Sequence, residues 1–295
     1  MVDITHKSNS LRIAIAQATV SVSKQETIDA IVNKTVPKGD VFEMAKTAGL
    51  FAAKRTSDMI PDCHPLPVEF TSVAYKINGL EINILVEVRT IYKTGVEVEA
   101  MHAASVVALT MYDMLKPIDK SIVIKNIMLL EKKGGKTDKL HEQRSDLQAV
   151  VIACSEVVMS GEKEDTAGKA ILEKLKKYEI NIADYVIISD DKDVIQEKVK
   201  KYCNNKINIL IITGGTGLTN RGITPEAIRP MLDIEIEGIA EAMRSYGQNR
   251  TAYAMFSRSV AGMIGKTLVL ALPGSTRGAV ESMDAIFPAV LHIFR

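Results

Sequence analysis

The spacing of hydrophobic and polar residues predicts an α+β domain in the first half of the 295-residue chain. Two runs in which apolar and polar residues alternate flank Asn78-Gly79, which is the strongest short signal for a β-hairpin. Hairpin strands beside helices are typical of an antiparallel sheet that is covered on one face. The predicted strands lie at 13–22, 68–77, 81–90 and 122–130, and the predicted helices at 24–33, 40–60 and 96–116.

Strand patterns and helix patterns alternate in the second half. The predicted strands lie at 149–154, 185–188, 207–212 and 267–272, and the predicted helices at 167–178, 193–202 and 224–232. This order predicts a three-layer α/β domain, a doubly wound parallel sheet with helices on both faces. The polar segment 130–148 contains Gly134-Gly135 and separates the two patterns, so we predict domains at 1–138 and 149–295 with a linker at 139–148.

A glycine-rich turn follows one of the buried strands of the second half. Ile209–Ile212 are four large aliphatic residues, and Thr213–Gly217 contains only glycine and threonine. Thr224 as N-cap and Pro225 in the first turn predict a helix after it. A strand, a glycine turn and a helix in this order can bind an anion through backbone N–H groups. The alternative is a turn that only connects the strand to the helix.

The position of other residues favours anion binding at this turn. In open α/β sheets, ligands bind beyond the carboxyl ends of the strands. Asp190, the turn Thr213–Gly217 and the segment Pro273–Ser275 are all predicted to lie at such ends.

Composition and charge exclude several classes of function. The net charge of +1 gives no general attraction to nucleic acid or to an anionic membrane. No apolar run is long enough to span a bilayer, and the polar segment Met1–Lys7 does not resemble a signal peptide. Three widely spaced cysteines indicate neither a disulfide framework nor a Cys-x-x-Cys zinc site. We therefore expect a cytoplasmic protein without nucleic-acid or membrane partners.

Ionisable residues of the first half have ordinary explanations when each is taken alone. His64 lies between Pro61 and Pro65, which restrict its backbone, so it suits a proton donor or a phosphate contact, or simply bonds its own turn. Asp113 and Lys116 are neighbours on a predicted helix and usually form a solvated ion pair. Lys38 and the lysines that surround Gly134-Gly135, namely Lys132, Lys133 and Lys136, suit a polyphosphate or an ordinary basic loop.

The distance between two acidic residues predicts an oligomer. Glu99 and Asp113 are fourteen residues apart on the predicted helix 96–116, so they lie about 21 Å apart along its axis. One small substrate cannot contact both on a straight helix. If both act in catalysis, a neighbouring subunit brings them together, and we predict composite sites between subunits.

The first half resembles cyclic pyranopterin monophosphate synthase of molybdenum cofactor biosynthesis. The motifs that carry the resemblance are Lys38-Gly39-Asp40-Val41-Phe42, Ile60-Pro61-Asp62-Cys63-His64-Pro65-Leu66, Lys93-Thr94-Gly95-Val96-Glu97-Val98-Glu99-Ala100, Ala104-Ser105-Val106, Tyr112-Asp113-Met114 and Gly134-Gly135-Lys136. The resemblance implies a ferredoxin-like fold, a homohexamer, and conversion of 3′,8-cyclo-7,8-dihydro-GTP to cyclic pyranopterin monophosphate with release of pyrophosphate. It implies no metal or other cofactor for this half.

The resemblance also implies the site residues of the first half. Asp113 and Lys116 are the expected acid/base pair, with Lys38 assisting, because the ring rearrangement needs several proton transfers. The expected substrate-binding residues are His64, Arg89, Glu97, Glu99, Lys132 and Lys136. Among these, the two glutamates are expected to orient the ring, and His64 and the lysines to bind phosphate.

The second half resembles the molybdopterin adenylyltransferase family, which binds molybdopterin and MgATP. The resemblance rests on Ser160–Gly168, Thr213–Gly217 with Thr224–Ile228, and Leu272–Ser275. It implies a pterin- or nucleotide-binding site made by Asp190, Thr213, Gly214, Gly215, Thr216, Gly217, Glu226, Pro273, Gly274 and Ser275. Asp190 matches one of two family aspartates and is the expected Mg²⁺ ligand.

The second family aspartate is replaced by Gly222 in this chain. Glycine has no side chain that could bind a metal, and Glu226 and Asp191 are the candidates to compensate for the missing carboxylate. Two functions therefore stay open for this half. One is a working adenylyltransferase, and the other is a non-catalytic module that binds pterin or nucleotide or serves assembly.

Overall fold

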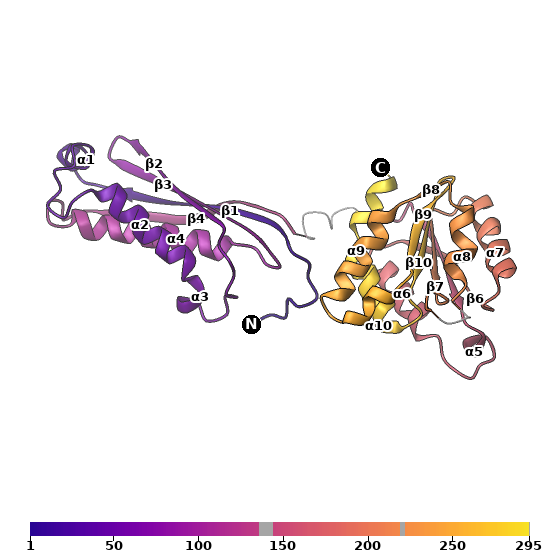
Figure 1. The fold of residues 1–295 in the computed structure, drawn as a ribbon. Helices are drawn as coiled ribbons and strands as arrows, with labels where there is room; N and C mark the ends of the chain where they lie inside the picture. The colour runs from indigo at the N-terminus through magenta and orange to yellow at the C-terminus, as the bar shows by residue number, and fades with distance from the viewer. Residues whose placement is uncertain (136–143, 219–221, 295) are drawn as a thin grey trace. The chain divides into compact units, whose positions relative to one another are not determined.

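The computed structural model describes residues 1–135, 144–218 and 222–294. The chain divides into two compact units, Met1–Asp138 and Lys139–Arg295 (Figure 1). In the described part of the chain, no helix is long and apolar enough to cross a membrane.

The first unit is an antiparallel four-stranded sheet with helices on one face (Figure 1). Its strands are β1 (Ser10–Ser21), β2 (Phe70–Asn78), β3 (Glu81–Tyr92) and β4 (Val123–Lys133), in the order β2-β3-β1-β4. Its helices are α1 (Gln25–Val32), α2 (Val41–Lys54), α3 (Thr56–Met59) and α4 (Glu97–Leu115). The predicted hairpin at Asn78-Gly79 joins β2 to β3, and Gly79 has the positive φ of 59° that the turn requires.

Alternation along the strands decides which face the helices cover. Ile82, Ile84, Val86 and Val88 of β3 are fully buried, and the residues between them are not. Burial of each such side chain contributes about 1.5–3 kcal/mol. The predicted helix 40–60 is two helices, because the chain leaves helical geometry at Arg55, although Asp40 does cap α2 by accepting from Glu43 N at 3.2 Å.

The second unit has a six-stranded sheet with helices on both faces, as predicted for a three-layer α/β domain (Figure 1). Its strands are β5 (Gln148–Cys154), β6 (Asn181–Ile188), β7 (Ile209–Thr213), β8 (Ile234–Glu235), β9 (Val260–Ile264) and β10 (Thr267–Leu272), in the order β6-β5-β7-β10-β9-β8. Its helices are α5 (Glu156–Met159), α6 (Thr166–Lys176), α7 (Lys192–Asn204), α8 (Thr224–Ile228), α9 (Glu237–Gln248) and α10 (Thr276–Ile286), with 3-10 turns η2 (Arg229–Met231), η3 (Ala252–Phe256) and η4 (Ala289–Phe294).

The predicted all-parallel sheet is wrong at one edge. Strands β6, β5, β7 and β10 are parallel, whereas β9 and β8 run antiparallel to their neighbours. The physical reason is the two-residue turn Gly265-Lys266, because so short a connection joins only antiparallel strands. Gly265 has a φ of 56°, which this hairpin turn favours.

Alternate residues of β7 serve two hydrophobic cores. Ile209 and Ile211 pack in the core beneath α6, α9 and α10, and Leu210 and Ile212 pack in the core beneath α7 and α8. The run Ile209–Ile212 is therefore buried on both faces, as its composition predicted. The glycine turn then begins where β7 leaves the sheet.

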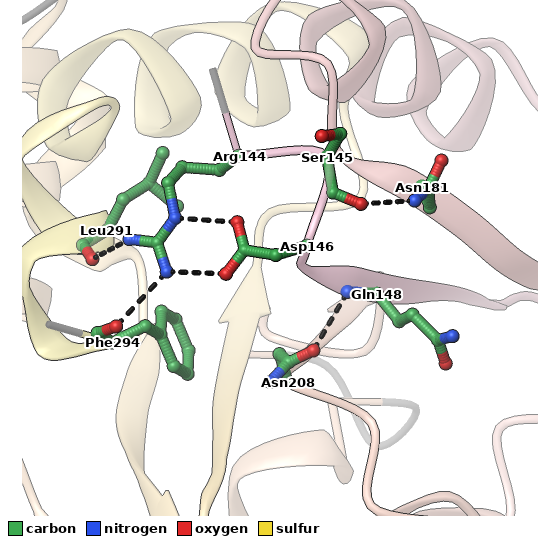
Figure 2. Close-up of polar contacts among 8 residues, drawn as sticks. All are labelled: Arg144, Ser145, Asp146, Gln148, Asn181, Asn208, Leu291 and Phe294. Carbon is green, nitrogen blue, oxygen red and sulfur yellow. Dashed lines mark hydrogen bonds and ion pairs between the residues drawn. The ribbon is translucent and has the colours of Figure 1, made fainter. Parts of the chain in front are cut away.

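The described residues of the predicted linker, 144–148, are bonded to the second unit (Figure 2). The Arg144 guanidinium pairs with both carboxylate oxygens of Asp146, at 2.9 and 3.0 Å. It also donates to the carbonyls of Leu291 at 3.3 Å and Phe294 at 3.1 Å, in the last turn of the chain. Asn181 donates to the carbonyl of Ser145 at 2.5 Å.

We expect the substitution Arg144→Met to lower the free energy of unfolding of the second unit by about 1–3 kcal/mol, because the carbonyls lose a charged donor. The measurement is a urea titration of the full chain, followed by amide signals of β5 and η4. The matched control is Arg229→Met, because Arg229 forms an ion pair with Glu235 on a side chain that is 58% exposed. The two variants should differ; equal stabilities would contradict the role of Arg144.

Candidate functional site

Lys38, Asp113 and Lys116, the residues expected as acid and base, form one charged group at the end of α4. The Nζ atom of Lys38 lies 2.6 Å from Oδ2 of Asp113, and the Nζ atom of Lys116 lies 2.7 Å from Oδ1. Lys38 also donates to the backbone carbonyl of Asp113 at 2.9 Å. Lys38 reaches this position because it directly precedes the capped start of α2, which packs along α4.

Two ammonium groups stabilise the ionised form of Asp113. The hydrogen bonds from Lys116 and then Lys38 lower the pKa of Asp113 to about 2. The bond to Asp113 in turn raises the pKa of Lys116. At neutral pH the group therefore holds one ionised carboxylate and a protonated Lys116.

The second group of predicted residues lies at the opposite end of α4. Glu97 begins the helix and pairs with Lys132 of β4 at 3.4 Å. Glu99 is only 2% exposed and accepts from the Cys63 thiol at 3.1 Å. Burial raises the pKa of Glu99, although the bond from Cys63 acts in the opposite direction. The neighbouring His64 bonds through Nε2 to the carbonyl of Val2 at 2.8 Å.

A small basic hollow of about 180 Å³ opens beside Glu97. Its charged lining includes Lys132 and Lys133 and three residues that the sequence did not single out as site residues: Lys7, Arg12 and Lys93. Arg12 donates to the carbonyls of Tyr92, Lys93 and Gly134 at 3.0–3.3 Å. The sequence analysis missed these three residues because an isolated charged residue has no periodic pattern. Only the neighbouring motif residues could have indicated a site here. Lys136 lies outside the described residues.

The structure does not bring all the predicted first-unit residues together. Lys38 and Lys132 bond to opposite ends of α4, so the expected polyphosphate site shared by these two lysines does not form within one copy. Arg89 contacts neither group. It donates to Glu87 at 2.6 Å and stacks over Phe70 on β2, on the side of the sheet opposite to the buried Val88.

All the predicted site residues of the second unit except Glu226 line one or both of two hollows that share a wall. One, of about 530 Å³, is lined by Asp190, Thr213, Gly214 and Gly222 among others. The other, of about 480 Å³, is lined by Thr216, Pro273, Arg244 and Tyr253 among others. Gly215, Gly217, Gly274 and Ser275 line both. The turn, Asp190 and Pro273–Ser275 therefore meet at the carboxyl end of the parallel strands.

Thr224 does not cap α8, which corrects the prediction. Ile223 occupies the N-cap position without a side-chain bond. The Thr224 hydroxyl instead donates to the carbonyl of Gly214 at 2.9 Å, and its backbone N–H donates to the carbonyl of Gly215 at 3.0 Å. Thr224 is fully buried, so its hydroxyl bonds to the nearby carbonyl of Gly214 and not to an N–H group of α8.

Neither carboxylate that was expected to compensate for Gly222 lines the hollow. Asp191 caps α7 by accepting from the backbone N–H groups of Asp193 and Val194. Glu226 forms an ion pair with Arg258. In the described residues, no group of three or more His, Cys, Asp or Glu side chains could hold a metal ion.

Two family models match the chain, one for each unit. The MoaC family matches residues 1–135, and the probable molybdopterin binding domain matches residues 149–292. The chain therefore combines a MoaC-family domain with a probable molybdopterin binding domain.

Relatives with the same combination span the whole chain. The molybdenum cofactor biosynthesis bifunctional protein of Chlorobaculum tepidum is 35% identical over 294 residues, which cover 100% of this chain and 93% of that protein. The protein of that name from Synechococcus elongatus is 34% identical and covers 99% and 95%. The chain belongs to the family of molybdenum cofactor biosynthesis bifunctional proteins.

Each half also has separate relatives. A cyclic pyranopterin monophosphate synthase of Geobacillus kaustophilus is 48% identical over 141 residues, 46% of this chain and 86% of that protein. The crystal structure of the molybdopterin biosynthesis enzyme MoaB from Thermus thermophilus is 37% identical and covers 50% of this chain and 92% of that chain, with a TM-score of 0.48.

We expect the Asp113 carboxyl group to titrate near pH 2 in the folded protein and nearer its usual 3.8 when Lys116 or Lys38 is replaced by methionine. Because the folded pKa is lowered, the stabilisation from this group is complete above pH 3.8 and is lost as the pH falls toward 2. The measurement is an NMR titration of side-chain carboxyl carbons. Lys120→Met is the control, and a midpoint of 3.8 in the unmodified protein would contradict the assignment.

Proposed function

We propose that the first unit is a cyclic pyranopterin monophosphate synthase that converts 3′,8-cyclo-7,8-dihydro-GTP to cyclic pyranopterin monophosphate and releases pyrophosphate. The observation that carries this proposal is the group Lys38–Asp113–Lys116, in which two ammonium groups contact one ionised carboxylate. The 48% identity to a protein named for this activity supports it.

The chemistry of the proposed reaction suits these residues. Conversion of a purine ring to a pterin moves several protons, so a base and an acid in one place lower its barriers. Asp113 accepts a proton, Lys116 donates one, and Lys38 assists by holding Asp113 in place. His64, Lys132 and Lys136 bind phosphate, Glu97 and Glu99 orient the ring, and Arg89 is a further substrate-binding residue.

We further propose that the active form is a homo-oligomer, a hexamer, with each site built by two copies. The two groups lie at opposite ends of the 19-residue helix α4, and Glu99 and Asp113 are about 21 Å apart along its axis. Exposed apolar residues on the first unit, among them Leu109, Phe51 and Ile91, support contacts between copies. The order β2-β3-β1-β4 with crossing helices supports assignment of this unit to the ferredoxin-like folds.

We expect the variant Asp113→Asn to lose synthase activity, because the neutral amide cannot accept the proton, and the variant His64→Ala to lose it through weaker binding. Mixing the two variants under conditions of subunit exchange should restore about a quarter of the native activity, since a composite site needs one intact group from each copy. The assay follows product formed from the purified cyclised GTP. Restoration without subunit exchange, or none with exchange, would contradict composite sites.

We propose that the second unit adenylylates molybdopterin with MgATP in a rearranged site. Mg²⁺ is usually held by one or two carboxylates together with substrate phosphates and water, so Asp190 at the hollow is a suitable protein ligand. When bound, the ion would neutralise charge on the phosphates. Asp190 and the turn residues Thr213–Gly217 with Pro273–Ser275 bind and orient the ligand. The presence of Gly222 is the observation that keeps a non-catalytic binding module as the alternative.

The test for the second unit is transfer of AMP from MgATP to molybdopterin by the full chain. We expect transfer, and a strong loss in Asp190→Asn. The variant Gly222→Asp should not improve it, because a Cβ atom at this position would lie 2.0 Å from the carbonyl oxygen of Gly217. Binding of MgATP without transfer in the unmodified chain would favour the non-catalytic module.

We also propose a cytoplasmic location, with the cyclised GTP intermediate and molybdopterin as the small-molecule partners. The domains are assigned to 1–138 and 149–295, with a linker at 139–148. Within this linker, Arg144 and Ser145 are bonded to the second unit.

A further inference from the structure

Every backbone carbonyl of the glycine turn, residues 214–217, accepts a hydrogen bond from one of two residues. The Thr224 hydroxyl donates to the carbonyl of Gly214 at 2.9 Å, and the Thr224 N–H donates to that of Gly215 at 3.0 Å. The Arg258 N–H donates to the carbonyl of Thr216 at 3.3 Å. The Arg258 guanidinium donates to that of Gly217 through Nη2 at 3.0 Å and Nε at 3.3 Å. Thr224 and Arg258 thus bond all four carbonyls of the turn, while the N–H of Gly214 donates to the carbonyl of Leu272 at 3.2 Å.

This arrangement determines where the N–H groups of the turn point. In a trans peptide, the carbonyl and the N–H of the next residue point in opposite directions. The N–H groups of Gly215, Thr216 and Gly217 therefore point away from Thr224 and Arg258. Within the described part of the chain, these three N–H groups have no hydrogen-bond acceptor.

The hollows lie on the other side of the turn from the two residues that hold it. Gly215, Thr216 and Gly217 line one or both hollows, whereas neither Thr224 nor Arg258 lines them. Gly214 and Gly215 have φ values of 103° and 62°, a conformation of the kind that forms a concave row of N–H donors. Three consecutive donors without acceptors are suited to a phosphate group.

Arg258 is suited to its position because its donors lie in one plane. Besides the carbonyl of Gly217, the guanidinium contacts the carbonyl of Gly222 and the carboxylate of Glu226. The ion pair with Arg258 outweighs the effect of burial and lowers the pKa of Glu226, which therefore stays ionised beside the guanidinium. A lysine ammonium has no planar fork and cannot make this set of bonds.

We propose that Arg258 is a positioning residue that, together with Thr224, orients the N–H groups of Gly215, Thr216 and Gly217 toward a phosphate group of the bound ligand. The inference rests on the proposed binding of a phosphate-bearing nucleotide or pterin by the second unit. Arg258 would then raise the affinity for phosphate without contacting the ligand.

The same contact explains why Gly222 has no side chain. A Cβ atom at position 222 would lie 2.0 Å from the carbonyl oxygen of Gly217 and 2.9 Å from Nη2 of Arg258. A side chain there would displace the bond between Arg258 and Gly217. In this chain, a side chain that carries a carboxylate at position 222 is incompatible with the hydrogen bonds from Arg258 to the carbonyl of Gly217.

The experiment measures binding of two probes, MgATP and adenosine, to the full chain by calorimetry. We expect Arg258→Met to weaken the binding of MgATP about 10- to 100-fold, since charge-assisted hydrogen bonds from the turn are lost, and to leave adenosine binding within twofold. Thr224→Val, which removes one hydroxyl donor without a change of shape, should weaken MgATP binding roughly 2- to 10-fold. The matched control is Arg229→Met, which removes an arginine paired with Glu235 away from both hollows and should leave both affinities unchanged.

The outcomes separate the inference from the proposed function. Equal affinity for MgATP in the unmodified chain and in both variants would overturn the positioning role while leaving the proposed function intact. A parallel loss of MgATP and adenosine binding would also overturn it, because Arg258 would then only maintain the fold. If the unmodified chain did not bind MgATP, the proposed function of the second unit would fail and this inference with it.

Discussion

The packing of α4 against the sheet is the contact on which the first unit depends. Small side chains meet at this contact, Ala100, Ala103 and Ala104 on the helix and Ala14 and Ala16 on β1, and all are fully buried. Their size lets the helix backbone approach the strands closely. The distance between Glu99 and Asp113 is then fixed at about 21 Å. In the proposed synthase, the two groups at the ends of α4 therefore act on one small molecule across two copies.

A comparable constraint operates in the second unit, where the turn after β7 has its carbonyls bonded by Thr224 and Arg258. Anion binding by a backbone requires that the N–H groups be oriented before the ligand arrives, because reorientation costs free energy. Glycine supplies the necessary positive φ at 214 and 215 but cannot hold a direction by itself. The buried threonine and the planar guanidinium supply the direction from residues remote in sequence.

Much of the fold was predictable because its signals are local. The hairpin at Asn78-Gly79, the cap at Asp40 and the doubly buried strand Ile209–Ile212 each depend on neighbouring residues. The antiparallel strand β9 was missed, although Gly265-Lys266 between two apolar runs is a hairpin signal of the same kind. The misassigned cap at Thr224 shows the limit of local reasoning, since its hydroxyl bonds to Gly214, ten residues away.

The sequence alone determined the hydrophobic periodicity of the strands and helices, the turns, and the motifs that contain Lys38, Asp113, Asp190 and the glycine turn. Only the tertiary structure decided which of these side chains meet. Lys38 joins Asp113 and not Lys132, and Arg258 rather than an acidic residue stands beside Gly222. The physical reason is that the pattern of side chains along a strand or helix is set by local geometry. Contacts between residues distant in sequence depend instead on how the elements pack. The sequence around Arg258 has no periodic pattern that would predict the residues it contacts.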